Sequence, residues 1–314
     1  MQYRRLGRTN LRVSVLGLGG GGRSRLGVRG DASADDVLRL VHRALDLGIN
    51  LFDTAADYGT EELLGAALAG TPRDSIVVST KFGATTRDGQ LKAPSALRSS
   101  LDQSLTRLRM DYVDVLYLHG VRADHYTTIR DAFREPLREA EHAGLTHFIG
   151  VTESWGLDHA HAMLRSAIPS GVWDVVMPGY NLLSPLTGEH VLPLAAEYDV
   201  GTMVMCAVRS VISQPSLVAQ QLSDWKREGL LAPDGPDDLD WVTRDGTESL
   251  TAAAYKFAAD HRGVSSVLSG TGNIQHLEQN VAAILGPPLP APVSQRLIEL
   301  FVPVGRNTGH GMRR

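Results

Sequence analysis

A regular alternation of short apolar runs and amphipathic segments limits the fold of this chain more than any other feature of its sequence. Eight apolar runs are typical of buried strands: Ser14–Gly17, Asn50–Asp53, Ser75–Thr80, Tyr112–His119, Phe148–Thr152, Val175–Pro178, Thr202–Ala207 and Ser266–Gly270. Seven segments between them have the apolar spacing of helices: Asp35–Leu47, Glu61–Ala69, Ser95–Leu108, Thr127–Ala143, Leu157–Ser166, His190–Tyr198 and Leu250–His261. Because repeated strand–helix units close into parallel barrels of about 250 residues or more, we predict an α/β fold, a (β/α)₈ TIM barrel with residues 1–314 as one domain.

Local start and stop signals agree with this periodicity. Asp35, Ser95 and Ser249 stand where helix N-caps belong, and Gly48 and Gly144 stand where helices end. The predicted helices therefore have both the spacing and the boundaries of real ones.

Three segments depart from the alternation. Residues 3–15 alternate apolar and polar side chains around a Gly-Arg-Thr-Asn turn, which predicts a β-hairpin before the barrel. Residues 209–248 are a long insertion after the seventh strand, rich in Asp, Gly and Pro, and we expect a functional loop there. The chain ends in a C-terminal helix and tail, of which residues 302–314 are expected to be flexible.

Composition narrows the class of function. The chain has 314 residues and a formal net charge of −4, with no basic cluster, so we expect a small-molecule partner and no nucleic acid. Cys206 is the single cysteine, which excludes a disulfide framework and a cysteine-based metal site. The N-terminal residues lack the pattern of a signal peptide, and no apolar run reaches the ~18 residues of a membrane helix. We therefore expect a cytoplasmic protein that does not enter a membrane.

Four polar residues stand at or near the predicted strand ends. Asp53 ends the second strand, Tyr58 lies in the loop that follows it, Lys81 follows the third strand and His119 ends the fourth. The carboxyl ends of barrel strands meet at one rim, where active sites are built, so these four side chains should converge. A Lys ammonium beside a Tyr hydroxyl lowers the tyrosine pKa, an Asp holds the Lys, and a His bonds the oxygen that is protonated. The set predicts Tyr58 as a general acid.

The surrounding motifs resemble the aldo-keto reductase superfamily along nearly the whole chain. The matching stretches are DTAADYG at 53–59, the Lys and His after the next strands, YRRLGRTNLRVSVLGLGG at 3–20, FIGVT at 148–152, Tyr180-Asn181 and SGTGNIQHLEQN at 269–280. The resemblance implies a catalytic tetrad of Asp53, Tyr58, Lys81 and His119. It also implies hydride transfer between NADP(H) or NAD(H) and an aldehyde or ketone, with no metal.

The resemblance also implies a set of cofactor contacts. These are Thr152, Glu153, Met177, Tyr180, Ala207, Arg209, Gly270, Thr271, Gly272, Asn273, His276, Gln279 and Asn280. Thr152 and Glu153 stand where the family has a Ser-Asn pair for the nicotinamide carboxamide, and Met177 replaces a Gln. Gly270 and His276 stand where NADPH-dependent members often carry Lys and Arg, which favours use of NAD or of both cofactors. Backbone N–H groups near Gly270–Asn273 are expected to meet the adenosine phosphate.

Other interpretations stay open beside this one. Gly17–Gly22 matches the GxGxxG fingerprint, but no helix is predicted directly after it, which indicates a glycine loop at the barrel mouth. Cys206 is better explained as a core side chain than as a nucleophile, while Trp155, Tyr180 and Tyr126 either line a substrate pocket or pack. The functional alternatives are oxidation of a sugar or alcohol in the reverse direction, or a cofactor-binding regulatory subunit with little activity.

Overall fold

Eight parallel strands form a closed barrel in this computed structural model, which describes residues 1–244 and 246–308. The strands follow one another around the barrel in chain order, and the last pairs with the first. Their bounds are β3 (Leu16–Gly19), β4 (Leu51–Asp53), β5 (Val77–Phe82), β6 (Val113–Val121), β7 (Thr146–Glu153), β8 (Val175–Met177), β9 (Gly201–Val204) and β10 (Ser266–Ser269). The predicted TIM barrel and its eight strands are confirmed.

Two predicted strand ends need correction. We expected Lys81 to follow its strand and His119 to end its own, but β5 continues to Phe82 and β6 to Val121. The pairing between the two strands extends as far as Phe82 and Leu118, so backbone hydrogen bonds hold this part of both strands in extended form. Both side chains still lie near the carboxyl ends of their strands.

The predicted hairpin consists of β1 (Tyr3–Arg5) and β2 (Arg12–Ser14), which pair antiparallel. Leu6 and Val13 are fully buried and join the apolar cluster that fills the barrel interior. Gly7 has a φ of +51°, and a Cβ there would lie 2.1 Å from the backbone nitrogen of Gly201, the first residue of β9. The hairpin therefore closes the amino end of the barrel.

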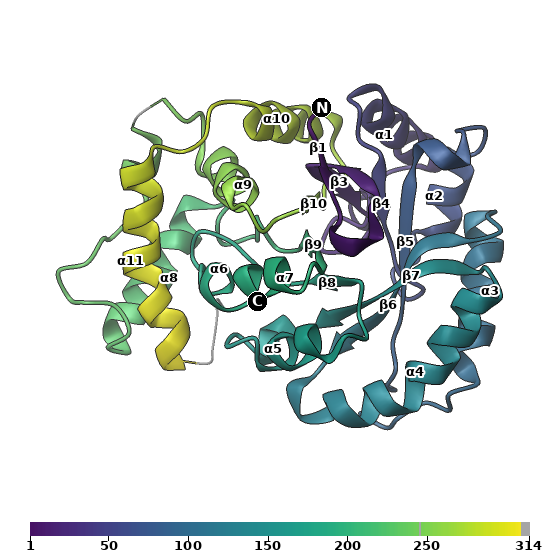
Figure 1. The fold of residues 1–314 in the computed structure, drawn as a ribbon. Helices are drawn as coiled ribbons and strands as arrows, with labels where there is room; N and C mark the ends of the chain where they lie inside the picture. The colour runs from purple at the N-terminus through teal and green to yellow at the C-terminus, as the bar shows by residue number, and fades with distance from the viewer. Residues whose placement is uncertain (245, 309–314) are drawn as a thin grey trace.

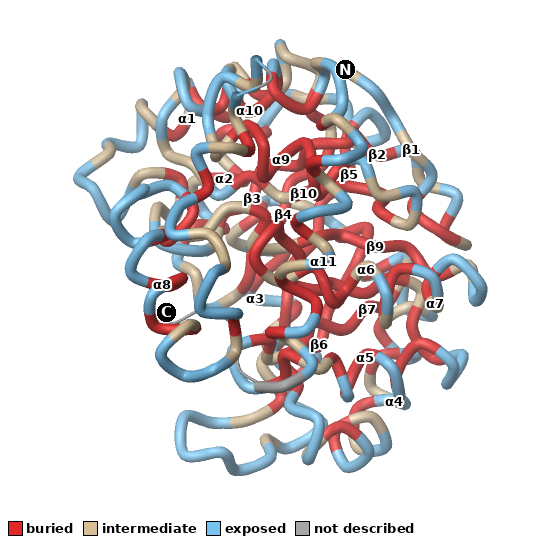
Figure 2. The backbone as a smooth tube through the Cα atoms, turned by 90° about the vertical axis from the view of Figure 1, so that its left-hand side faces the viewer, coloured by how far each residue is buried: buried red, intermediate tan, exposed pale blue. Residues whose placement is uncertain are grey.

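Helices cover the outside of the barrel (Figure 1), and the strands at its centre are the most deeply buried part of the chain (Figure 2). The helices are α1 (Ala34–Asp46), α2 (Glu61–Ala67), α3 (Ala96–Leu108), α4 (Tyr126–His142), α5 (Ala162–Ala167), α6 (Thr187–His190), α7 (Leu192–Glu197), α8 (Pro215–Arg227), α9 (Leu250–Asp260), α10 (Ile274–Leu285) and α11 (Ala291–Thr308).

The helix boundaries follow the predicted signals in part. Ser249 caps α9 as predicted, since its hydroxyl accepts from a backbone N–H of the first turn. Asp35 is not the cap of α1, because Ser33 caps that helix through a reciprocal capping box and Asp35 lies inside the helix. Ser95 precedes α3 but makes no capping bond. Positive φ angles agree with the two predicted helix-ending glycines, Gly48 and Gly144.

Two predicted helices are shorter or broken. The helix predicted over 157–166 spans only Ala162–Ala167, because His161 has a φ of +57° and the Asp158 carboxylate accepts from the first backbone N–H groups of α5. The segment 190–198 is divided between α6 and α7, where Pro193 has no N–H to continue the hydrogen bonds.

The insertion and the tail hold more regular structure than expected. Residues 209–248 include the helix α8, whose Trp225 ring lies 5.8 Å from the ring of Phe301 in α11. Residues 302–308 belong to α11, and Val302 and Val304 are buried. Apolar side chains that pack against each other account for both corrections (Figure 1, yellow and green helices at the left). Residues 309–314 of the predicted tail lie outside the described residues.

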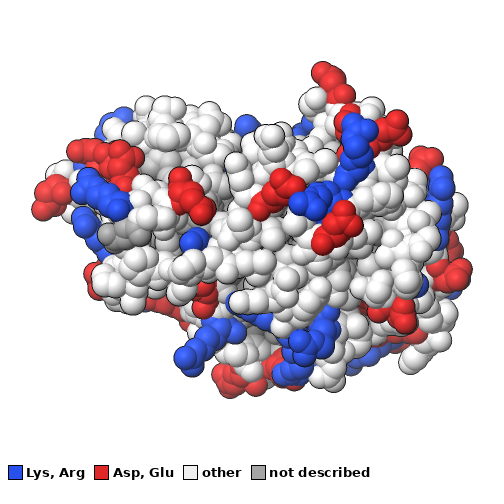
Figure 3. Space-filling view, turned by 90° about the horizontal axis from the view of Figure 1, so that it is seen from above, with Lys and Arg blue, Asp and Glu red and all other residues white. Residues whose placement is uncertain are grey.

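The surface agrees with the charge pattern of the sequence. Figure 3 shows Lys and Arg side chains interspersed with Asp and Glu across one face, without a continuous basic area. Within the described residues, no helix combines the length and the apolar character that a membrane span requires.

Candidate active site

A buried ion pair lies at the carboxyl ends of β4 and β5. Lys81 Nζ donates to Asp53 Oδ2 at 2.5 Å and to the Thr54 carbonyl oxygen at 2.7 Å, and both charged side chains are almost fully buried. The Ser79 hydroxyl donates to the other oxygen of Asp53 at 2.7 Å. Each charge thus has a partner and further hydrogen bonds, which a buried pair needs to be tolerated.

Tyr58 and His119 meet beside this pair. The Tyr58 hydroxyl lies 3.2 Å from His119 Nε2, and the two rings are arranged edge to face. Lys81 Nζ is 4.9 Å from the centre of the Tyr58 ring. The structure therefore brings together all four side chains of the predicted tetrad.

Two residues outside the predicted tetrad hold Tyr58 in place. An added Cβ at Gly21 would lie 2.5 Å from Cε2 of the Tyr58 ring, so this glycine lets the loop after β3 pack on the tyrosine. Arg25 in the same loop donates to the Tyr58 carbonyl oxygen at 2.7 Å. Since α1 begins only at Ala34, the glycine run opens no helix, and its place beside Tyr58 accounts for it better than a dinucleotide fingerprint.

The electrostatic balance at Tyr58 differs from our expectation. Burial raises the pKa of the Tyr58 phenol above its ordinary 10.0 and outweighs the nearby charge of Lys81, which lowers it. Burial alone also lowers the pKa of Lys81, but the neighbouring Asp53 charge and further contacts raise it above 10.5 overall. Lys81 therefore lowers the Tyr58 pKa as predicted, but burial reverses the net direction of the shift. Tyr58 keeps its proton and Lys81 keeps its charge at neutral pH.

Asp57 is a further neighbour of this group. Its Oδ1 lies 3.5 Å from His119 Nδ1, on the opposite side of the imidazole from Tyr58. The hydrogen bond with His119 holds the pKa of the Asp57 carboxyl below its usual value. Asp57 belongs to the same DTAADYG stretch as Asp53 and Tyr58, so its position before the tyrosine was the available signal.

The residues expected to hold the nicotinamide lie deeper than expected. Thr152, Met177, Tyr180 and Ala207 are all buried, and Thr152 accepts the Gly120 backbone N–H at 2.7 Å. Met177 belongs to the barrel-interior cluster. The Tyr180 ring packs on Phe257 and His261 of α9 and its C-cap, so Tyr180 does not face the rim.

Glu153 is bound within the protein rather than free for a ligand. Its carboxylate lies 2.8 Å from His161 Nδ1 and accepts the Gly179 backbone N–H at 2.8 Å, and its side chain is fully buried. His161 Nε2 in turn lies 2.9 Å from the Thr187 hydroxyl. Burial raises the pKa of Glu153, and His161 opposes that shift. The expectation that Glu153 accepts a hydrogen bond from a carboxamide is therefore not met in this conformation.

Two of the predicted cofactor contacts lie directly after β9. Ala207 is buried, whereas Arg209 is partly exposed. Its guanidinium lies 5.2 Å from the centre of the Trp155 ring, which belongs to the loop after β7. Trp155 is 3% exposed, and a Cβ at Gly179 would lie 2.2 Å from its ring. Of the three rim aromatics left open by the sequence, Trp155 covers the end of β8 and Tyr180 packs on Phe257. Tyr126 is buried and accepts from the indole N–H of Trp173.

The segment after β10 divides into exposed and internally bound residues. Gly270, Asn273, His276 and Gln279 are exposed, and Thr271 is partly exposed. The Asn273 side chain caps α10 by accepting the His276 backbone N–H. This segment presents a capped helix start to solvent, as the phosphate end of a nucleotide site requires.

Two predicted contacts in this segment have a structural role inside the chain. A Cβ at Gly272 would lie 2.2 Å from Gly27 Cα, so this glycine allows the loop after β3 to cross it. Asn280 is buried and donates to Ser269 Oγ at 3.0 Å. Their presence in the sequence is accounted for without a ligand.

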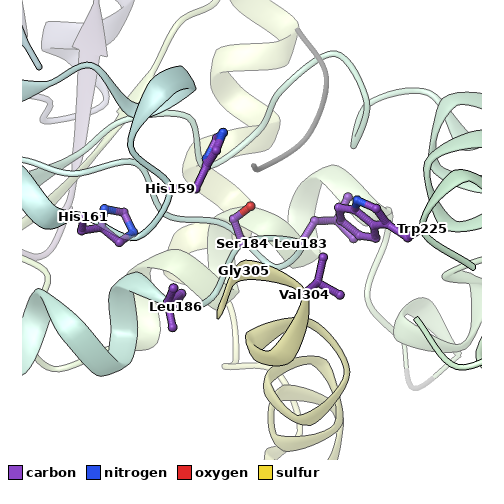
Figure 4. Close-up of a pocket in the computed structure, with 8 residues that line it drawn as sticks. All are labelled: His159, His161, Leu183, Ser184, Leu186, Trp225, Val304 and Gly305. Atoms are coloured by element: carbon purple, nitrogen blue, oxygen red, sulfur yellow. The ribbon is translucent and has the colours of Figure 1, made fainter. Parts of the chain in front are cut away.

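A small cavity elsewhere in the molecule is separate from the tetrad. It has room for about 10 Å³, roughly one water molecule, between α11, α8 and the residues around Leu183 (Figure 4). His159 and His161 line it, with none of the four tetrad residues. Among the described residues, no three His, Cys, Asp or Glu side chains gather closely enough to hold a metal ion.

Comparison with known proteins places the chain among oxidoreductases. The model of the aldo/keto reductase family matches residues 15–300. L-galactose dehydrogenase from Arabidopsis thaliana is 30% identical over 90% of this chain and 88% of its own length, and D-threo-aldose 1-dehydrogenase from a Pseudomonas species is 30% identical over 79% and 83%. The holo form of aldo-keto reductase AKR11C1 from Bacillus halodurans superposes with a TM-score of 0.73 at 25% identity, covering 96% of each chain.

Proposed function

Because this chain belongs to the aldo/keto reductase family and is an oxidoreductase, we propose that it reduces an aldehyde or ketone with NADP(H) or NAD(H), using Tyr58 as proton donor. The observation that carries this proposal is the contact of Tyr58 with His119 directly beside the buried Lys81–Asp53 pair. Small-molecule carbonyl and alcohol compounds are the substrates of this family. A cytoplasmic location stays a prediction from the sequence.

Each of the four side chains has a separate role in the proposed reaction. Asp53 and the Thr54 carbonyl hold the Lys81 ammonium beside the Tyr58 ring. Because burial raises the Tyr58 pKa, the phenol keeps its proton until a substrate oxygen accepts it. Lys81 then stabilises the phenolate that forms, and His119 donates to or accepts from the same oxygens. A bound nicotinamide cofactor supplies the hydride.

The described residues fit such a cofactor at its phosphate end better than at its nicotinamide end. The exposed start of α10, with Gly270, Asn273 and His276, would hold the adenosine phosphate, while Arg209 is a further candidate contact. Glu153 and Tyr180 are bound inside the protein and would not hold the carboxamide in this conformation. Since neither position 270 nor position 276 carries Lys or Arg, we propose that NADH is used at least as well as NADPH.

Oxidation of a sugar is the second candidate, and one observation favours it. Both relatives named above, L-galactose dehydrogenase and D-threo-aldose 1-dehydrogenase, carry the names of sugar dehydrogenases. In that direction Tyr58 must lose its proton, and its raised pKa then opposes the reaction at neutral pH unless bound ligands change the balance. A regulatory subunit without turnover is the weaker alternative, because binding alone needs no such set of four groups.

Replacement of Tyr58 tests the proposal. We expect Tyr58→Phe to lower kcat at least 100-fold in either direction, because general acid–base groups contribute about 10²- to 10⁴-fold. The assay follows nicotinamide absorbance with aldehydes and ketones in one direction and with L-galactose and other aldoses in the other. Tyr198→Phe, at an exposed tyrosine after α7, is the matched control and should keep full activity. Equal turnover of wild type and Tyr58→Phe would remove Tyr58 from the mechanism.

A further inference from the structure

His119 lies between two groups with different hydrogen-bonding requirements. Its Nδ1 atom is 3.5 Å from Asp57 Oδ1, and its Nε2 atom is 3.2 Å from the Tyr58 hydroxyl. An ionised carboxylate accepts hydrogen bonds and donates none, whereas a phenol can do both. Because the pKa of Asp57 is held below its usual value, this carboxyl is ionised at neutral pH. Asp57 therefore favours a proton on Nδ1 of the imidazole.

The position of that proton decides what Nε2 can do. In a neutral imidazole, one nitrogen carries the proton and the other has a lone pair that accepts. When Nδ1 carries the proton toward Asp57, Nε2 accepts and the Tyr58 hydroxyl is the donor in their contact. The Tyr58 proton then points at a base that belongs to the protein. This arrangement gives His119 a partner other than the substrate oxygen.

Charges at both ends of this contact favour transfer of the proton. The Lys81 ammonium lies 4.9 Å from the centre of the Tyr58 ring, and the Asp57 carboxylate lies on the far side of His119. Transfer from Tyr58 to His119 gives a phenolate beside a cation and an imidazolium beside an anion. Attraction between opposite charges stabilises both products. The series Lys81, Tyr58, His119 and Asp57 then alternates in charge along its length.

Neighbouring carboxylates on the adjacent strands are bound elsewhere. Asp53 on β4 accepts from Lys81, and Glu153 on β7 is bound within the protein. Asp57 is the carboxylate whose contact with His119 the structure shows. The tautomer of this imidazole therefore depends on the residue that directly precedes the catalytic tyrosine in the chain.

Exposure gives the proton a route to water. The Asp57 side chain is 71% exposed and the His119 side chain is 23% exposed, so an imidazolium formed here can release its proton to solvent. Solvent also weakens the attraction between the two groups, and the effect of Asp57 is expected to be moderate.

We propose that Asp57 is a positioning residue that holds the Nδ1 proton of His119, so that Nε2 takes the Tyr58 proton during alcohol oxidation and returns it during carbonyl reduction. This inference rests on the proposed function. It supplies the base that the raised pKa of Tyr58 requires when the enzyme works as a dehydrogenase.

The proton and electron balance of the oxidation is simple. The Tyr58 O–H bond breaks as an N–H bond forms at His119 Nε2, and Asp57 and Lys81 stabilise the resulting charges. The phenolate takes the hydroxyl proton of the alcohol while the alcohol carbon loses hydride to the oxidised nicotinamide cofactor. The imidazolium then releases one proton to water. Each turnover gives a carbonyl compound, a reduced cofactor and one proton.

The first experiment observes the proton on His119 without any turnover. Protein with ¹⁵N-labelled histidine is titrated by NMR from pH 6 to pH 10, and loss of a signal in His119→Gln identifies the residue. We expect the neutral ring of wild type to carry its proton on Nδ1. Asp57→Asn should populate the Nε2–H form, and Asp57→Glu should keep the wild-type form. A neutral wild-type ring protonated on Nε2, or the same form in Asp57→Asn, overturns the proposal.

The second experiment measures the pH profile of oxidation. With an aldose substrate at pH 7, we expect Asp57→Asn to lower kcat about 3- to 10-fold, the modest size reflecting an exposed charge, and to change KM less than twofold. The loss should shrink toward pH 10, where hydroxide removes the Tyr58 proton without His119. Since the proton returns by the same contact, kcat for reduction should fall as well. Asp57→Glu should retain at least half of the wild-type kcat.

A matched control separates this role from a general effect of charge. Asp111→Asn removes the same charge from an exposed position before β6, at the other end of the strand that carries His119, and should leave kcat unchanged. A raised KM with unchanged kcat in Asp57→Asn would assign Asp57 to substrate binding, and an equal loss of kcat at every pH would indicate a structural role. Either result contradicts the inference.

Failure of the proposed function would be recognised separately. If wild type neither oxidises nor reduces any compound tested, the enzymatic proposal fails, while the NMR titration still shows whether Asp57 holds the Nδ1 proton. If turnover requires Tyr58 but does not respond to Asp57→Asn at any pH, the inference fails and the Tyr58 chemistry stands.

Discussion

At the scale of single residues, the balance around Tyr58 decides the chemistry. The phenol lies among Lys81, Asp53 and Asp57, whose charges act on its pKa in opposite directions, and burial adds the largest contribution. The net effect raises the pKa, so the protonated form persists well into the alkaline range. A proton donor benefits from this arrangement, whereas a base does not.

The pH dependence of carbonyl reduction should reflect the raised pKa of Tyr58. Since Tyr58 must be protonated and its pKa lies above 10.0, we expect kcat for reduction to show no decline from loss of this proton between pH 7 and pH 9. Oxidation of an alcohol, which needs the deprotonated phenol, should rise with pH over the same range. The measurement is kcat against pH at saturating substrate in both directions. A fall in the reduction rate centred below pH 8 would mean that Lys81 dominates over burial.

At the scale of elements, the N-terminal hairpin closes the amino end of the barrel. Leu6 is fully buried in the interior cluster, and its side chain lies where a Cβ on Gly201 would be only 2.8 Å away. Arg5 binds Asp199 and Arg8 binds the Tyr198 carbonyl oxygen, which tie the hairpin to the segment before β9. These contacts link the first residues of the chain to residues about two hundred positions later.

Shortening the Leu6 side chain should destabilise the folded protein. We expect Leu6→Ala to lower the free energy of unfolding by about 2 to 5 kcal/mol, because the rigid strands around it cannot collapse into the space. Chemical denaturation measures this loss. Leu285→Ala, at a leucine 38% exposed at the end of α10, should cost much less. Equal losses in the two variants would show that the hairpin is not part of the core.

At the scale of the whole molecule, one closed sheet brings together residues from the entire chain. β10 pairs with β3, and the Ser266 hydroxyl donates to the Ser14 carbonyl oxygen, so the barrel closes only when both ends are in place. That residues 1–314 form a single domain stays our prediction. A ligand that spans the rim should stabilise this whole unit, because it contacts loops from several strands.

Thermal unfolding with each cofactor should show both whether a bound ligand stabilises the whole barrel and which cofactor is preferred. At a concentration 100 times Kd, a bound cofactor adds about 2.7 kcal/mol to the free energy of unfolding. We expect NADH to raise the melting temperature at least as much as NADPH. His276→Arg, which places a cation at the exposed start of α10, should increase the effect of NADPH selectively. A larger shift with NADPH in the wild type would contradict the expected preference.

Local periodicity was sufficient to predict much of the molecule. The eight strands, the order of the barrel, the hairpin and most helices follow from spacing, because burial on one face imposes a period that local sequence must carry. The meeting of Asp53, Tyr58, Lys81 and His119 also follows, since parallel strands direct their carboxyl ends to one rim.

Only the tertiary structure decided the remaining features. The Glu153 carboxylate binds His161 because of the local loop geometry after β7. Asp57 lies beside His119, and α8 packs on α11, through contacts between residues distant in sequence. The Tyr58 pKa depends on burial, which no spacing of charged residues reveals. The sequence alone thus determined which residues reach the rim, whereas the packing of the loops determined which of them stay free to bind, because hydrogen-bond partners and burial are properties of the folded chain.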